Sequence, residues 1–233
     1  MYIVFLALVV IFKFVLTITS ALDSKKSKGI AMTDEKRFKF YRNGIVGLWC
    51  IAIAVFFMSF IGNIGFADIG FRPISFSQNI WFTVITLILS GLLLIFCLYR
   101  IIAPFLIKNY REKIKKDIAG VEGDILPRTK KERRLFALVS FSAGTCEEIF
   151  YRGFVAFLLQ AVFPGIPIFL IVLIPSVLFG IAHTYQGLQG VISTGIVGAF
   201  FMCVFLVTGG SLILPMVLHF LLDFSSTFLL SEE

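Results

Sequence analysis

The sequence predicts an all-α, polytopic membrane helix bundle with about seven transmembrane helices, and three observations support this fold class. Apolar side chains make up 58% of the 233 residues, which is more than a soluble domain of this length carries. Apolar runs of about 20 residues recur, and each is long enough to cross a bilayer as a helix. These runs lack the period-2 alternation of barrel strands, so we expect helices, which satisfy their own backbone in lipid.

The helices are expected at regular intervals along the chain. They lie near residues 2–22, 44–66, 80–106, 135–160, 166–184, 188–208 and 211–230. The first run has a weak cleavage-like site at Thr19-Ser20-Ala21, as in a signal peptide. However, it lacks a basic n-region, and Lys13 interrupts its apolar part. We therefore expect a retained anchor in which Lys13 snorkels or faces another helix.

The predicted helices divide the chain into three parts. Residues 1–107 contain the first three helices, and residues 135–230 contain the last four. Between them, residues 108–134 form a basic linker, predicted as an amphipathic helix followed by a turn at Gly120, Gly123 and Pro127. We expect the functional site within the C-terminal four-helix core.

The net charge of +7 comes from two segments between predicted helices. One lies between the first two helices, the other is the 108–134 linker, and the 67–79 loop carries only Arg72 against Asp68. This asymmetry follows the positive-inside rule, so both basic segments are expected in the cytoplasm and the 67–79 loop outside. It favours contact with anionic lipid headgroups over nucleic-acid binding. The basic residues of the first segment are Lys25, Lys26, Lys28, Lys36, Arg37, Lys39 and Arg42.

The four cysteines are interpreted as buried, apolar-like thiols. They fall within predicted spans and form no CxxC pair, so neither a disulfide framework nor a thiolate zinc site is indicated. A nucleophilic role for Cys146, which precedes Glu147, is the minor alternative. The other three are Cys50, Cys97 and Cys203.

Ionisable groups inside the last four predicted helices are concentrated on three of them. A charged side chain costs about 2.5–3.5 kcal/mol at the centre of a membrane helix, so such a concentration indicates one interior, water-accessible cavity. A polar network that only locks the helices together is the alternative interpretation. The residues are Glu147, Glu148 and Arg152, His183, and His219 with Asp223; the chain has only two histidines.

The spacing of these residues separates the two adjacent carboxylates. Glu148 and Arg152 are four apart, with the acid first, so they can pair on one helical face. Glu147 lies about 100° around the helix and need not join that pair. One carboxylate is then structural and the other is available as a general base. Four-residue spacing also places Asp223 beside His219.

Three motifs in this part of the chain resemble those of the CAAX-protease and bacteriocin-processing family of intramembrane proteases. The resemblance covers about 135–230, and Arg152-Gly153 and the Thr208–His219 stretch also look like this family. The motifs, in order, are EExxxR at Glu147–Arg152, FxxxH at Phe179–His183 and HxxxN/D at His219–Asp223.

The resemblance implies a glutamate-dependent peptidase whose site opens towards the cytosol. Carried over residue by residue, it makes Glu147 the base and His183 its partner in activating water. Glu148 and Arg152 form the supporting pair. It further implies that His219 and Asp223 stabilise the oxyanion. The sequence leaves open whether Phe179 packs beside His183 or contacts substrate.

Two chemical alternatives stay open within this resemblance. Asp223 stands where Asn is the other common residue, and an ionised Asp cannot donate to an oxyanion. The family has also been described as metalloproteases, and Glu147, His183 and His219 could ligate zinc. Because the HExxH signature is absent, we favour a mechanism without a metal cofactor.

The expected partner is a membrane-associated peptide or protein substrate. The composition resembles that of a bacterial protein, so a bacterial plasma membrane is expected, with CAAX-like, bacteriocin or signalling-peptide processing, or bacteriocin self-immunity. The alternatives are a non-enzymatic scaffold that regulates a partner such as a sensor kinase, and a proton-coupled transporter. No inverted repeat is visible to support a transporter.

Overall fold

The computed structural model describes residues 1–9, 11–12, 15, 33–117 and 125–229, and the described part is all-helical, without strands. The all-α class is therefore confirmed. Residues 2–9 are helical, as are 11–12 and 15. The predictions for Lys13, for Thr19–Ala21 and for Lys25, Lys26, Lys28, Gly120 and Gly123 fall outside the described residues. The helices are α2 Asp34–Ile61, α3 Ile80–Leu106, α4 Tyr110–Asp117, α6 Lys130–Glu148, η1 Ile149–Val155, α7 Ala156–Val162, α8 Ile168–Ala182, η2 Thr184–Gln186, α9 Gly187–Val207, α10 Ile213–Ser225 and η3 Ser226–Phe228.

The helix boundaries follow local capping rather than hydropathy. Helix α2 begins at Asp34, ahead of the predicted 44, because Thr33 caps it by accepting from the Lys36 amide and the polar first turns continue the helix. It ends at Ile61 rather than 66, ahead of Asn63, whose φ is +51°. Helix α3 has the predicted bounds, with Asn79 as its cap. An apolar run thus predicts the part of a helix inside the membrane but not where the helix ends.

Within the described residues, three helices are long and apolar enough to cross a membrane. They are α2, α3 and the continuous stretch Thr184–Val207, while Ile168–Ala182 and Ile213–Phe228 are shorter apolar helices. Helices α6, η1 and α7 follow one another without a break from Lys130 to Val162. The count of seven spans stays a prediction.

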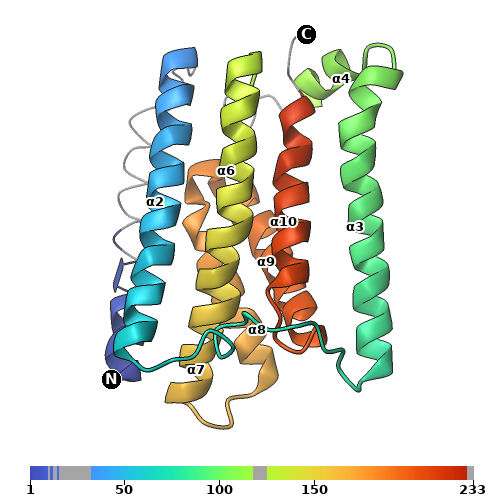
Figure 1. The fold of residues 1–233 in the computed structure, drawn as a ribbon. Coiled ribbons are helices and arrows are strands. Elements are labelled where there is room, and N and C mark those ends of the chain that lie inside the picture. The colour runs from blue at the N-terminus through green and yellow to red at the C-terminus, as the bar shows by residue number, and fades with distance from the viewer. Residues whose placement is uncertain (10, 13–14, 16–32, 118–124, 230–233) are drawn as a thin grey trace.

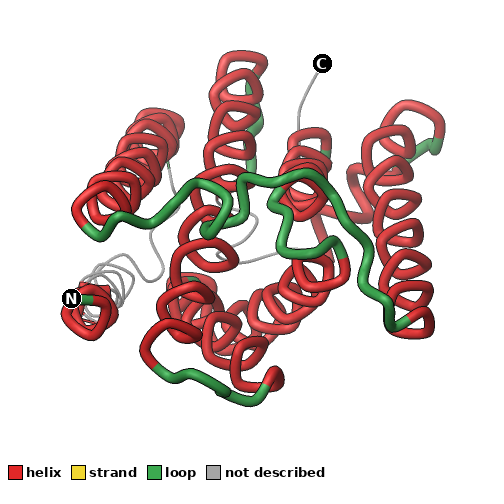
Figure 2. Tube along the Cα trace, turned by 60° about the horizontal axis from the view of Figure 1, so that its bottom comes forward, coloured by secondary structure: helices red, strands yellow, loops and turns green. Residues whose placement is uncertain are grey.

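The long helices stand side by side, with α2, α6, α10 and α3 in one row and α8 and α9 behind them (Figure 1). The start of α2, helix α4 and the start of α6 lie at one end of the bundle. The described parts of the two basic segments therefore share an end, and the 62–79 segment lies at the opposite end (Figures 1 and 2). We call the end that holds the starts of α2 and α6 the basic end.

The 62–79 segment crosses the end of the bundle and is bound to the turn before α10. The Leu212 amide donates to the Gly70 carbonyl at 3.0 Å, and the Ser211 hydroxyl donates to the Arg72 carbonyl at 2.8 Å. Ile69 is fully buried against Gly153, where an added Cβ would lie 2.4 Å from the Ile69 oxygen. This contact supports the segment that carries the central arginine of the core.

Small residues allow the core helices to approach closely. A Cβ on Gly144 of α6 would lie 2.7 Å from the Phe220 nitrogen of α10, and one on Gly180 of α8 would lie 2.5 Å from the Val191 oxygen of α9. A Cβ on Gly198 of α9 would lie 3.1 Å from the Phe179 ring, and such small residues are typical of close helix packing in membranes. The expectation for the thiols is correct for Cys97 and Cys146, which are buried, only in part for Cys203, which is half-buried, and wrong for Cys50, which is exposed.

Candidate active site

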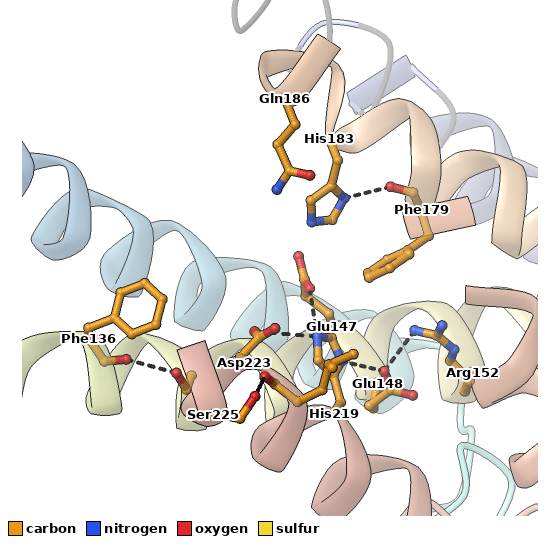
Figure 3. Close-up of polar contacts among 12 residues, drawn as sticks. Phe136, Glu147, Glu148, Arg152, Phe179, His183, Gln186, His219, Asp223 and Ser225 are labelled. Carbon is orange, nitrogen blue, oxygen red and sulfur yellow. Dashed lines mark hydrogen bonds and ion pairs between the residues drawn. The ribbon is translucent and has the colours of Figure 1, made fainter. Parts of the chain in front are cut away.

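The candidate site is formed where the end of α6 meets α8, α9 and α10. Glu147 and Glu148 are the last residues of α6, Arg152 lies in the π-helical segment η1, and His219 and Asp223 lie in α10. Phe179 is in α8, and His183 follows its last residue. The fold therefore brings all seven predicted residues into one region (Figure 3).

Glu148 and Arg152 form the ion pair that their spacing predicted. Arg152 Nη1 donates to Glu148 Oε1 at 2.8 Å, and both side chains are essentially without solvent contact. Arg152 Nη2 donates to the Gly198 carbonyl of α9 at 3.0 Å. The pair thus ties η1 to α9. Since π-helical segments occur often at functional sites, the position of Arg152 in η1 fits the interpretation of this region.

Glu148 also orients an imidazole, which spacing within one helix did not reveal. His219 Nδ1 lies 2.7 Å from Glu148 Oε1, the same oxygen that accepts the hydrogen bond from Arg152 Nη1. The ring stacks on Phe201 at 5.2 Å between centroids. A carboxylate can only accept when ionised, so Nδ1 carries a hydrogen and Nε2 is the nitrogen directed to the cavity.

Glu147 is the carboxylate that faces the interior space. Its Oε2 lies 3.7 Å from His219 Nε2, and its side chain keeps 17% exposure, against 0% for Glu148. In Figure 3 the carboxylate extends between His183 and His219. The division of the two carboxylates into a buried, paired one and an accessible one agrees with the spacing argument.

His183 is held by the backbone of its own helix. Its Nδ1 lies 2.8 Å from the Phe179 carbonyl, which can only accept, so Nδ1 donates, and in the neutral ring Nε2 is an acceptor. Asp223 Oδ2 lies 3.6 Å from His219 Nε2, and its side chain is 36% exposed. Both side chains line the same cavity.

Phe179 serves as a packing residue at the centre of the site. It is 2% exposed, and its ring lies 4.7 Å from His183 and 5.8 Å from His219. The Arg152 guanidinium lies 4.8 Å over the same ring. Phe179 also contributes to the cavity wall, so packing and contact with a ligand are compatible there.

The cavity has a volume of about 470 Å³ and reaches from the site towards the basic end. Glu147, His183, His219 and Asp223 line it, together with Tyr41 of α2. Cys146 is fully buried and is not part of the lining. The other walls are mainly apolar, and they include Phe40, Leu48, Leu126, Phe136, Val139, Leu222 and Leu229.

The sequence named Glu147, His183 and His219 as the residues that could ligate zinc. Among the described residues, no three His, Cys, Asp or Glu side chains are grouped as metal ligands. Each imidazole has its Nδ1 engaged, by Phe179 or by Glu148.

Sequence reasoning missed two supporting contributions. The Gly198 carbonyl and the Phe201 ring come from α9, a helix without any charged residue. A backbone oxygen and an ordinary apolar ring carry no distinguishing signal in the sequence. Only the packing of α9 against η1 and α10 brings them to Arg152 and His219.

Fold and site define an integral membrane protein with a cluster of ionisable side chains around an internal cavity. The particular family follows from a family model described as "Type II CAAX prenyl endopeptidase Rce1-like", which matches residues 131–225. Residues 131–225 are thus similar to this family of membrane proteases, and the resemblance seen in the sequence is confirmed. No curated protein and no solved structure gives a significant match to the chain.

Proposed function

We propose that the protein is an intramembrane, glutamate-dependent endopeptidase that hydrolyses a membrane-associated peptide or protein. One observation carries the proposal: Glu147 faces the cavity beside both imidazoles, while Glu148 is neutralised behind it by Arg152 and His219. CAAX-like proteins, bacteriocins and signalling peptides are the substrate classes we consider. The shared end of the two basic segments supports a cytoplasmic position for the cavity mouth.

In the proposed reaction, Glu147 and His183 Nε2 bind the attacking water. Glu147 takes a proton as the water oxygen bonds to the peptide carbonyl carbon. The carbonyl oxygen becomes an oxyanion, which accepts hydrogen bonds from His219 Nε2–H and from protonated Asp223. The carbon–nitrogen bond then breaks as Glu147 gives its proton to the leaving amine.

The surroundings of His219 support its role as a donor. Its Nε2 lies 3.7 Å from Glu147 Oε2 and 3.6 Å from Asp223 Oδ2. Oxygen acceptors beside Nε2 favour a hydrogen on Nε2, while the hydrogen on Nδ1 is already directed to Glu148. A ring with a hydrogen on each nitrogen donates to Glu148 and directs Nε2–H towards Glu147 and Asp223.

The test is peptide processing by Glu147→Gln and His183→Ala variants that insert and fold normally. We expect both variants to lose processing, because each removes a group that binds the attacking water. Folded yield and thermal unfolding in detergent serve as controls. Full activity of Glu147→Gln would refute the peptidase proposal in this form and favour a scaffold, which should tolerate an isosteric amide.

The same assay separates the metal-free mechanism from a zinc mechanism. Because the proposed base and its partner act directly on water, prolonged chelation should leave the purified protein active, with less than stoichiometric zinc by elemental analysis. Loss of activity with recovery on adding zinc, but not magnesium, would instead support ligation by Glu147, His183 and His219.

A further inference from the structure

A second groove lies at the basic end, between the start of α6 and the end of α10 with η3 (Figure 1). It has a volume of about 330 Å³, and none of its lining residues also lines the cavity of the candidate active site. Three of the lining side chains are cations and none is a carboxylate, so the groove is suited to an anion. The lining residues are Lys130, Arg133, Arg134, Ala137, Phe224, Thr227 and Phe228.

The start of α6 carries more positive charge than its immediate surroundings balance. Its first five residues, Lys130–Arg134, include four cations and one carboxylate. Cations are unfavourable at the N-terminal end of a helix, where the helix dipole is positive. The carboxylate, Glu132, is buried and already accepts from Arg37 and from two backbone amides. A bound anion would therefore relieve the repulsion among the cations that line the groove.

Two of these cations, Lys130 and Arg134, are placed to bind one ligand together. They are four residues apart on α6, so their side chains extend from the same face of the helix, and both are exposed. Neither forms an ion pair within the described part of the chain. Arg133 adds positive charge to the groove but already has another interaction partner, so we assign it no ligand.

The groove also contains a hydroxyl that lacks a partner. Thr227 is 3% exposed, and its Oγ1 forms no hydrogen bond with any described residue. A buried donor of this kind is unfavourable unless an acceptor is supplied. Phosphate oxygens are strong acceptors, and they also attract the ammonium of Lys130 and the guanidinium of Arg134. The donor set of the groove therefore fits a phosphate group.

An apolar strip leads from the groove away from the basic end. The rings of Phe228 and Phe224 lie 5.4 Å apart between centroids, and Phe224 stacks on Phe220 at 5.3 Å. Their four-residue spacing places these rings on one face of α10 and η3. On the α6 side, Phe141 is 52% exposed and lies 6.5 Å from Phe220. The strip reaches the level where Gly144 brings α6 against the backbone of α10.

We propose that the groove binds an anionic phospholipid, with the phosphate at Lys130 and Arg134 and an acyl chain along the strip of Phe228, Phe224 and Phe220. Cations that flank apolar helices lie at the level of lipid headgroups, which is where this groove opens. From Arg134 to the level of the strip's far end, seven residues on, α6 rises about 10.5 Å. That length lies within one leaflet, which is about half of a hydrocarbon core of about 30 Å.

Binding is measured by native mass spectrometry of the full chain in neutral detergent. The probes are phosphatidylglycerol and phosphatidylcholine with identical acyl chains, with inorganic phosphate as the soluble anion. We expect phosphatidylglycerol to bind about 30-fold more tightly than phosphatidylcholine, because each of two cations near the membrane surface contributes about fivefold to the affinity for an anionic lipid.

The variants locate this preference. Lys130→Gln combined with Arg134→Gln should abolish it, and each single substitution should lower it about fivefold. Lys36→Gln combined with Lys39→Gln is the matched control, since it removes two exposed cations from the same end of the bundle but outside the groove. The control should keep the preference. Ala137→Phe, which fills the apolar part of the groove, should weaken the binding of both lipids.

Several outcomes overturn the proposal. They are equal binding of the two lipids, a preference that survives the loss of both groove cations, and an equal loss of preference in the control. Displacement of phosphatidylglycerol by millimolar inorganic phosphate would assign the groove to a soluble phosphate compound instead of a lipid. If the double variant does not fold, the two single substitutions and Ala137→Phe decide between these outcomes.

The lipid site is independent of the proposed peptidase chemistry, because groove and cavity share no lining residue. The Glu147→Gln protein should therefore show the same lipid preference as the native protein. Loss of processing with this preference intact would leave the lipid site standing, and an active peptidase without the preference would count only against the lipid site.

Discussion

Two buried clusters in this protein pair arginine with glutamate, and they differ in how completely the carboxylate is satisfied. At the basic end, Arg37 Nε donates to Glu132 Oε1 at 2.9 Å. The backbone amides of Arg128 and Thr129 donate to Glu132 Oε2 at 2.8 and 3.0 Å. Both oxygens of Glu132 are thus engaged, and Arg37 also pairs with Asp34.

The cluster in the core is satisfied on one side only. Arg152 and His219 both bind Oε1 of Glu148, while Glu148 Oε2 and Arg152 Nε have no hydrogen-bond partner among the described residues. Beside it, Glu147 faces the cavity. A buried ion pair alone therefore does not mark a site, because the Arg37–Glu132 cluster, which we call the saturated cluster, only joins α2 to α6. The distinguishing feature is a second carboxylate next to the pair and open to a cavity.

The largest expected effect comes from breaking the core cluster. Glu148→Ala leaves Arg152 buried without its carboxylate and releases His219, at a cost of about 3–5 kcal/mol in the free energy of unfolding. Thermal unfolding and folded yield in detergent measure this loss. Glu147→Ala is the matched control, and it should lower activity with little loss of stability. Equal losses of stability and activity in both variants would contradict the division of the two carboxylates.

The next largest effect concerns Asp223, whose Oδ2 lies 3.6 Å from His219 Nε2. If protonated Asp223 donates to the oxyanion, Asp223→Asn should keep most activity, because the amide also donates. Asp223→Leu should lose about 10²–10³-fold in kcat, the scale of one lost oxyanion donor. Severe loss of kcat in a folded Asp223→Asn protein would instead indicate an ionised Asp223 that orients His219.

The smallest expected effect is on the saturated cluster. Burial opposes ionisation of Glu132, but hydrogen bonds from the Arg128 and Thr129 amides and from Arg37 outweigh it and lower the pKa of Glu132 below its ordinary value of 4.5. Its stabilising contribution is then complete above pH 4.5 and is lost as the pH falls through the lower pKa of the folded state.

Replacing Glu132 by Gln should remove this contribution, of about 1 kcal/mol, at neutral pH. The melting temperatures of native and Glu132→Gln proteins should therefore differ at pH 7 and converge as the pH is lowered towards 3, with kcat unchanged at pH 7. A difference in melting temperature that persists at low pH would show that Glu132 acts through packing instead of charge.

The sequence by itself determined the all-α membrane class and the composition of the site. Hydropathy predicted helices at each of the six segments from 44 onwards because a chain in lipid has no other way to satisfy its backbone. The four-residue spacing of Glu148 and Arg152 predicted their pair because both lie on one turn of one helix. Local geometry of this kind is encoded within a few residues of sequence.

Only the tertiary structure decided which contacts form between different helices. The packing of α10 directs His219 Nδ1 to Glu148, and the packing of α9 brings Gly198 and Phe201 to the cluster. The packing of α3 likewise brings Arg100 to the cavity. Helix starts such as Asp34 depended on caps that hydropathy does not register. The physical reason is the same throughout: periodicity fixes the face of one helix, whereas contacts between faces are fixed by side-chain shape and by the glycines that let helices approach.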